Sequence, residues 1–272
     1  MLNLIAATQA EADPVISALK LKKITAPLNC YQNKDTHLVI AGIGKCGTAT
    51  ACGWLAEKTA PSSGRTGTGK SAAWLNFGIA GRGSTDTGTL MMAHEVTDAA
   101  TGRVWYPHRI FQSMPSSSLT TVDRPLADYP PGQLLDMEAS AFVESARHFS
   151  HAELVQSVKV VSDNEKQPYT NINAKLANQL ITDNTKSILE CAQTLQALAA
   201  SIAPMDSSIS DTILEQWHFS VSQTVRLERL LQRYGVIYSP MTDIPPGLQE
   251  QKSTKDALNW LQSAVDSNKS YL

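Results

Sequence analysis

The sequence predicts an α/β fold built around a largely parallel or mixed sheet. Short apolar runs bounded by glycines and polar turns are typical of buried strands. Longer segments with helical periodicity follow several of these runs, and such alternation favours a sheet covered by helices. The chain has 272 residues, of which 42% are hydrophobic, so it is long enough for one large core and a small appendage.

The first part of the chain alternates between predicted strands and predicted helices. Strands are expected at the largely apolar segments Leu2–Ala7, Thr36–Ala41, Ala73–Phe77 and Thr89–Val96. Helices are expected after the first two of these runs, at Gln9–Leu19 and at about Cys46–Lys58. The glycine-containing segment Pro61–Lys70 is expected to form a polar loop.

The second part begins with the segment Thr101–Gly132, which is rich in proline and serine and is expected to be irregular. A helix from about Glu138 to Phe149, a strand ending at Val161 and a long helix within Asn171–Ile202 follow.

Beyond about Met205 only helical patterns remain, at Thr224–Tyr234 and Thr254–Val265. Leu227, Leu230 and Leu231 share one face of the first of these helices. We therefore expect a domain of residues 1–204 and a helical C-terminal appendage of residues 205–272.

Composition excludes several classes of function. The net charge is −2, so the chain carries no overall electrostatic footprint for nucleic acid or for an anionic membrane. Arg226, Arg229 and Arg233 share one helix face, which we interpret as a solvated face. No apolar run approaches the roughly 18–20 residues of a membrane span, and Leu2–Ala7 lacks the basic flank of a signal peptide. A cytoplasmic protein is expected.

Cysteine and histidine spacings give no sign of a metal site. The four cysteines form no C-x-x-C pair and are expected to be reduced thiols. His94-Glu95 lacks the second histidine of a zinc-binding helix. We expect neither a metal nor a cofactor.

Two glycine motifs match nucleotide-binding patterns. Gly64–Ser71 satisfies G-x-x-x-x-G-K-[ST], but a predicted helix precedes it and the predicted strand Ala73–Phe77 follows it. A phosphate loop needs the opposite order, so we interpret the segment as a surface loop. Gly42–Gly47 satisfies G-x-G-x-x-G after a strand, but no acid lies in the Ser62–Lys70 segment, where a dinucleotide site would have one. We interpret it as a tight turn.

Two carboxylates occupy positions typical of an active site. Glu138 opens a predicted helix in Asp136–Ala141, and Asp163 ends a predicted strand in Ser162-Asp163-Asn164. Both belong at the rim of an α/β sheet, where ligands bind. The positive end of a helix dipole favours an ionised carboxylate, so Glu138 is expected to stay ionised. Without further context, each residue could serve only to cap a helix or to form a turn.

Five segments together resemble the purine and uridine phosphorylase superfamily. They are similar to the 5′-methylthioadenosine/S-adenosylhomocysteine nucleosidases and futalosine hydrolases, and the resemblance spans about residues 2–200. These segments are Ala6–Glu11, Gly42–Lys45, Asn76–Gly81 and the frames of Glu138 and Asp163. The resemblance implies a three-layer αβα nucleoside phosphorylase-like fold with a central mixed sheet, and a homo-oligomer with a dimer favoured.

The resemblance also implies roles for the acids. Glu138 would accept hydrogen bonds from the ribose hydroxyls, with Met137 against the sugar. Asp163, oriented by Ser162, would protonate the leaving base, and Glu11 would activate the attacking water. General acid catalysis of this kind typically contributes about 10²–10⁴-fold. Glu11 could equally be a solvated acid in the first turn of a helix.

Further substrate contacts follow from the same frames. Candidate substrate-binding residues within them are Phe77, Gly78, Ile79, Ala80 and Asn164. Trp105 and Arg109 belong to an aromatic-basic cluster that would lie near the 5′ end of the nucleoside or at a dimer contact, unless it is a packed loop. Compared with the family, the stretch that binds the base is shortened to Thr120–Gly132 and contains no phenylalanine to stack on a purine. Tyr129 is the candidate to take that place.

The expected function is hydrolysis of the N-glycosidic bond of a purine-type nucleoside, which releases the base and a ribose derivative. Phosphorolysis is the first alternative, but phosphorylases of the superfamily hold phosphate with arginines, and no arginine precedes Arg65 here. A non-catalytic nucleoside sensor is the second alternative. Ile79 permits it, because the methylthioadenosine nucleosidases have a serine at that position.

Overall fold

The computed structural model describes residues 1–59, 72–201, 207–238 and 243–267. Their contacts divide them into two compact units. Residues 1–59 and 72–201 form the α/β unit, and residues 207–238 and 243–267 form the helical unit. The boundary predicted at residue 204 lies outside the described residues, as does the predicted loop Pro61–Lys70.

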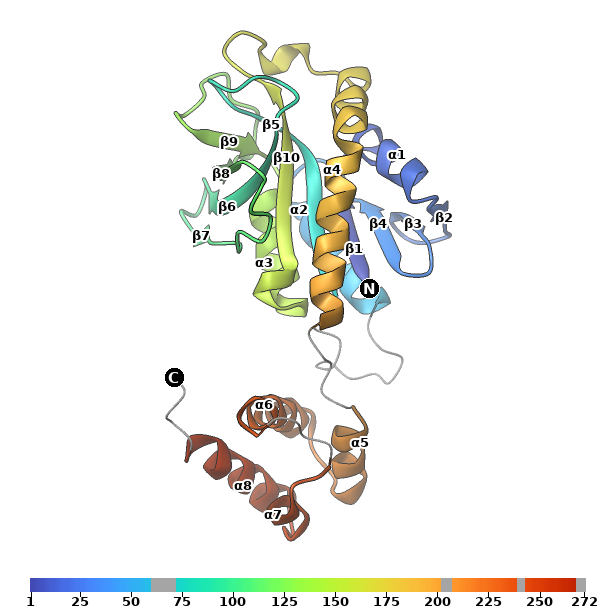
Figure 1. Ribbon diagram of the computed structural model, residues 1–272, viewed down its shortest axis with the longest axis vertical. Coiled ribbons are helices and arrows are strands. Elements are labelled where there is room, and N and C mark those ends of the chain that lie inside the picture. The colour runs from blue at the N-terminus through green and yellow to red at the C-terminus, as the bar shows by residue number, and fades with distance from the viewer. Residues whose placement is uncertain (60–71, 202–206, 239–242, 268–272) are drawn as a thin grey trace. The chain divides into compact units, whose positions relative to one another are not determined.

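A mixed sheet forms the centre of the α/β unit (Figure 1). Its middle strands are β4 (Thr36–Ile40), β1 (Leu2–Ala6), β5 (Ala73–Gly81) and β10 (Val155–Asp163), which are parallel to one another in that order. Their carboxyl ends therefore meet at one edge of the sheet, where ligands bind in α/β folds.

The remaining strands extend this centre on both sides. Beyond β4 lie β3 (Asn29–Gln32) and β2 (Lys22–Lys23), both in antiparallel pairings. On the other side, β10 pairs with β6 (Leu90–Asp98), and the order continues through β8 (Ser116–Thr121) and β9 (Gln133–Asp136) back to β5. These pairings close five strands into a ring, and β7 (Val104–Trp105) pairs with the edge of β6.

Helices cover both faces of the sheet, so that the sheet is the middle of three layers. Helices α1 (Gln9–Ala18) and α4 (Ala174–Ser201) pack against each other and share one apolar cluster with β1 and β5. Helices α2 (Lys45–Lys58) and α3 (Ala139–Phe149) pack together and share a second cluster on the other face. The predicted three-layer αβα fold with a mixed sheet is confirmed.

Strands in the segment expected to be irregular are the main difference from the sequence prediction. β8 has the sequence SSSLTT, and its residues alternate between half-buried and buried. Because its buried positions include small hydroxyl side chains, the strand carries little apolar signal. The prediction of an irregular Thr101–Gly132 segment was therefore wrong for β7 and β8. The short strands β2, β3 and β9 were also not predicted.

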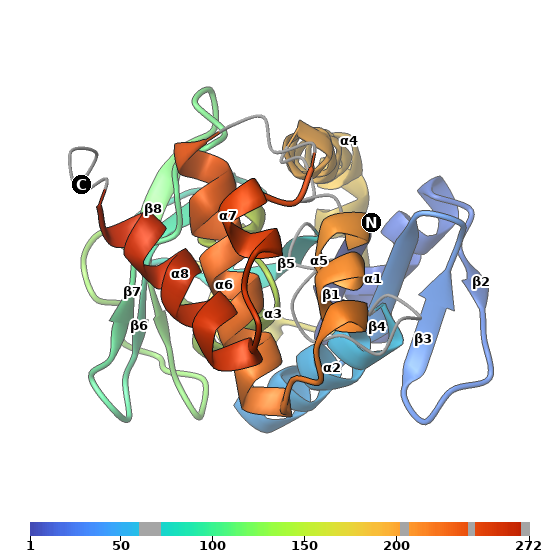
Figure 2. The same ribbon diagram turned by 90° about the horizontal axis from the view of Figure 1, so that it is seen from below.

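The helical unit consists, in its described residues, of α5 (Ser207–Gln216), α6 (Val221–Ile237), α7 (Pro246–Gln249) and α8 (Thr254–Asp266). Helices α6 and α8 pack against each other (Figure 2). The predicted apolar face of α6 is buried in this unit's own core, which includes Leu227, Leu230, Leu231, Ile213 and Leu261. Helices α5 and α7 were not predicted. None of the described helices is long and apolar enough to cross a lipid bilayer.

Candidate active site

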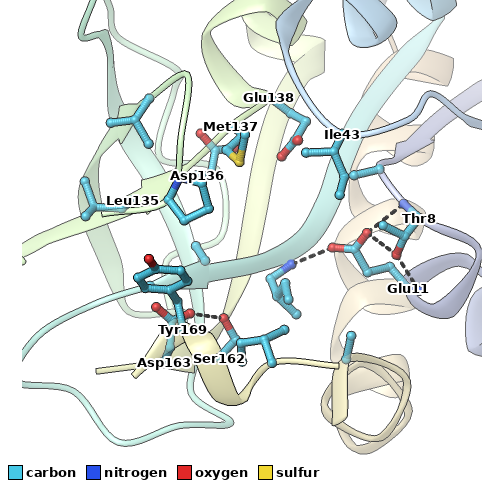
Figure 3. A pocket seen from close by; sticks show the side chains of 18 of the residues that line it. Thr8, Glu11, Ile43, Leu135, Asp136, Met137, Glu138, Ser162, Asp163 and Tyr169 are labelled. Atoms are coloured by element: carbon cyan, nitrogen blue, oxygen red, sulfur yellow. Dashed lines mark hydrogen bonds between the residues drawn. The ribbon is translucent and has the colours of Figure 1, made fainter. Parts of the chain in front are cut away.

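A cavity of about 380 Å³ opens at the carboxyl ends of β1, β5 and β10. Its walls come from the start of α1, the ends of β5 and β10, and the turn between β9 and α3. Glu11, Glu138 and Asp163 all line it (Figure 3), although they lie far apart in the sequence. The structure therefore brings together the three acids that the sequence predicted as catalytic residues.

Glu11 is held at the start of α1 by a reciprocal hydrogen-bond pattern. The Thr8 side chain caps the helix, and the backbone N–H and hydroxyl of Thr8 donate to Oε2 of Glu11 at 2.8 and 2.7 Å. The backbone N–H of Ile79 donates to Oε1 at 3.0 Å. A carboxylate has about four acceptor positions, so three fixed donors leave one position for a further donor such as water.

Glu138 lies at the N-terminus of α3 and is 6% exposed. Its Oε1 accepts a hydrogen bond of 2.8 Å from the backbone N–H of Gly44. Gly44 has a φ of 102°, which side-chain-bearing residues rarely adopt, and this conformation belongs to the turn that presents the N–H.

The surroundings of Glu138 oppose the ionisation that its position at a helix N-terminus favours. Burial raises its pKa to about 7, with Asp136 and Glu11 adding to the rise, while Lys159 and the Gly44 hydrogen bond oppose it. The cost of removing the carboxylate from water therefore exceeds the lowering of its pKa by Lys159 and by the Gly44 hydrogen bond. Near neutral pH this group therefore changes charge easily.

Lys159 is a buried charged residue beside the site that the sequence analysis did not predict. It lies on β10 and is fully buried, and its Nζ forms an ion pair of 2.9 Å with Oδ2 of Asp136. Burial lowers its pKa, but Asp136, Glu138 and Glu11 raise it more, so the ammonium stays charged. A lysine inside the apolar run Leu154–Val161 was the available signal, because lysine is almost never fully buried unless it is paired.

Asp163 ends β10 at the opposite side of the cavity from Glu11 at the start of α1, as Figure 3 shows. The hydroxyl of Ser162 donates to Oδ1 of Asp163, and the hydroxyl of Tyr129 donates to Oδ2 at 2.7 Å. Ser162 therefore contacts Asp163 as the resemblance implied, whereas the tyrosine contact was not foreseen.

The glycine turn after β4 contributes to the same cavity. Ile43 lines the cavity and Gly44 binds Glu138. A Cβ at Gly47 would lie 2.3 Å from the backbone oxygen of Ala41, so a glycine is needed there for α2 to approach the strand closely. Lys45 binds Asp98 at 3.0 Å and so ties the turn to β6. The interpretation of this motif as a tight turn agrees with these contacts.

The other predicted binding residues divide into two groups. Ile79, Ala80 and Met137 line the cavity. Phe77 and Gly78 do not line it, because Phe77 is fully buried in the core. Gly78 lies beneath Glu11, where a Cβ would be 2.6 Å from Oε1.

Three further predicted binding residues lie away from the cavity lining. Asn164 holds the turn after β10 by accepting hydrogen bonds from the backbone N–H groups of Lys166 and Gln167. Trp105 is buried on β7 with the Arg103 guanidinium 5.1 Å above its ring, and Arg109 is exposed. Trp105 is packed, as the packed-loop alternative expected, but it lies in a strand that pairs with β6.

The lining also identifies the chemistry that the cavity can support. Most of the remaining wall is apolar, and no arginine, lysine or histidine lines the cavity among the described residues. Within the same residues, no group of three potential ligands is placed to hold a metal ion. The cavity thus combines buried acids with apolar walls, a combination typical of sites for small organic ligands.

Comparison with solved structures identifies the architecture. A 5′-methylthioadenosine/S-adenosylhomocysteine nucleosidase from S. pneumoniae superposes with a TM-score of 0.55 at 18% identity, over 72% of this chain and 99% of that one. The α/β unit has the fold of these nucleosidases.

Other nucleosidases of the same name give similar results. The enzyme from Campylobacter jejuni has a TM-score of 0.55 at 14% identity, over 71% and 98% of the two chains. The one from Chlamydia trachomatis has a TM-score of 0.53 at 21% identity, over 70% and 98%. The sequence matches no protein-family model and no curated protein, so the likeness lies in the fold.

Proposed function

We propose that this chain is a nucleosidase that hydrolyses the N-glycosidic bond of a purine-type nucleoside. The observation that carries the proposal is that Glu11, Glu138 and Asp163 are all buried and all line one cavity. The cavity volume of about 380 Å³ falls in the range of roughly 300–1,000 Å³ found for small-molecule sites. The fold shared with methylthioadenosine nucleosidases supports the same function.

The proposed reaction assigns one task to each acid. Glu11 uses its remaining acceptor position to take a proton from water as the water oxygen bonds to the anomeric carbon. The bond from that carbon to the base breaks in the same step, and Asp163 gives its proton to a base nitrogen. The base then leaves as a neutral molecule. Glu11 releases to solvent the proton that it took from water, and Asp163, which enters the step protonated, takes up a new proton from solvent.

Glu138 would bind the sugar. It accepts one backbone hydrogen bond from Gly44, so about three acceptor positions remain for the two vicinal ribose hydroxyls. Hydrogen bonds to the ionised form favour that form, and substrate would therefore draw Glu138 toward ionisation. These bonds strengthen as the sugar ring becomes positively charged, which lowers the energy of the transition state.

Water is the favoured nucleophile over phosphate. Phosphate binding relies on arginine or lysine side chains or on converging backbone amides. The described lining contains neither arginine nor lysine, and the backbone N–H of Ile79 at the end of β5 is already bonded to Glu11. A homo-oligomer, with a dimer favoured, and a cytoplasmic location belong to the same proposal.

The test is release of free base from a panel of purine nucleosides by the full chain, with and without inorganic phosphate. Asp163→Asn should reduce release by about 10²–10⁴-fold while nucleoside still raises the thermal midpoint. Asp35→Asn, at an exposed aspartate outside the cavity lining, is the matched control and should keep wild-type rates. Turnover that requires phosphate would show a phosphorylase. Nucleoside binding without base release would show a sensor.

A further inference from the structure

Tyr129 contacts the proposed acid at the base end of the cavity. Its hydroxyl donates to Oδ2 of Asp163 at 2.7 Å, while Ser162 donates to Oδ1. Each oxygen of the carboxyl group thus accepts a hydrogen bond from a different segment of the chain. Ser162 belongs to β10, and Tyr129 belongs to the loop before β9. This arrangement fixes the plane in which the carboxyl group lies.

Two glycines, Gly81 and Gly83, lie in close contact with the pair formed by Tyr129 and Asp163. A Cβ at Gly81 would lie 2.5 Å from Oδ2 of Asp163 and 2.8 Å from a ring carbon of Tyr129. A Cβ at Gly83 would lie 2.9 Å from the Cβ of Tyr129. Because contacts this short do not occur, a side chain at either position would force Asp163 or Tyr129 to shift from its place.

The ring of Tyr129 packs in a cluster of its own, apart from the two main cores. It joins Val122 and Leu135, with Met137 packed against them, and the ring itself is 7% exposed. Tyr129 and Met137 both line the cavity, so one apolar wall runs from the base end toward the sugar end.

The hydroxyl of Tyr129 is suited to donating rather than ionising. Burial and the hydrogen bond to Asp163 raise its pKa above the ordinary value, against a smaller opposing effect of the Tyr169 backbone. A neutral phenol has one proton to donate, and here that proton points at Asp163.

We propose that Tyr129 is a positioning residue that orients the carboxyl group of Asp163 toward the departing base. Proton transfer needs the donor within about 2.6–3.2 Å of the base nitrogen and correctly aligned. A carboxyl group anchored by Ser162 alone can rotate about its side-chain bonds, whereas the second anchor holds one orientation. This role rests on the proposed function, and it gives the shortened loop before β9 a specific task.

The test compares two substrates that differ in their need for a proton. The first is the purine nucleoside cleaved fastest by the wild-type chain. The second is 4-nitrophenyl β-D-ribofuranoside, whose nitrophenolate leaves without being protonated. Tyr129→Phe removes the hydroxyl and keeps the ring. Tyr106→Phe is the matched control, since Tyr106 is 67% exposed and away from the cavity lining.

Tyr129→Phe should lower kcat for the purine nucleoside by about 10–100-fold with little change in KM, because alignment of the acid is lost. Its rate on the nitrophenyl riboside should stay within about threefold of wild type, because that leaving group needs no general acid. Asp163→Asn should show the same pattern more strongly. The ratio of the two rates in one sample does not depend on the folded fraction, so partial misfolding cannot mimic the result.

Two results would overturn the role of Tyr129 alone: wild-type rates on both substrates, or an equal loss on both, which indicates packing only. If the wild-type chain cleaves neither substrate, the proposed function fails and the role of Tyr129 fails with it.

Discussion

Replacing Glu138 with glutamine should stabilise the protein while removing its activity. Burial raises the pKa of Glu138 from 4.5 to about 7 in the folded chain. Between these two values the folded protein holds a proton that the unfolded chain has released. The free energy of unfolding therefore falls as pH rises through this window.

The size of the effect follows from the same two values. Each pH unit of the window costs about 1.4 kcal/mol, so above pH 7 the loss approaches a limit of about 3–4 kcal/mol. Glutamine has no proton to lose and keeps an oxygen that can accept the Gly44 hydrogen bond. Glu138→Gln should therefore be more stable than wild type at pH 8, and the gain should shrink to below about 1 kcal/mol at pH 5.

Thermal unfolding of the full chain at both pH values measures this gain. For a folded unit as large as the α/β unit, the thermal midpoint shifts by about 2–4 °C per kcal/mol. A rise of several degrees is therefore expected for Glu138→Gln at pH 8. Glu57→Gln, at an exposed position on α2, is the control and should change little at either pH. A gain of equal size at both pH values, or none at pH 8, would refute the reasoning about burial.

Two further substitutions test the ion pair and the base end of the cavity. Lys159→Met removes the partner of Asp136 and leaves a buried carboxylate without its cation, so the free energy of unfolding should fall by about 3–5 kcal/mol. Urea denaturation measures this fall, and a change below about 1 kcal/mol would contradict the prediction. Gly81→Ala places a methyl group 2.5 Å from Asp163 and should reduce base release about 10²-fold through misalignment of the acid. Gly53→Ala, where the new methyl group meets nothing within 4 Å, is its control, and equal rates for the two variants would argue against the close packing.

The candidate site was partly predictable because its acids lie in local frames. Glu11, Glu138 and Asp163 each follow or open an element whose pattern is visible in the sequence, and parallel strands bring their carboxyl ends to one edge. Trp105 and Arg109 were placed less well. Their local composition is unusual, but the pairing of β7 with β6 decides where Trp105 lies, and Arg109 is exposed.

The sequence by itself determined the alternation of strands and helices, the buried strands at the centre and the apolar face of α6. These features depend on periodicity, which is local along the chain. Only the tertiary structure decided that Tyr129 meets Asp163, that Lys159 pairs with Asp136 and that Glu138 has a raised pKa. Each of these depends on which polar groups are withdrawn from water together, and that is set by long-range packing rather than by neighbouring residues.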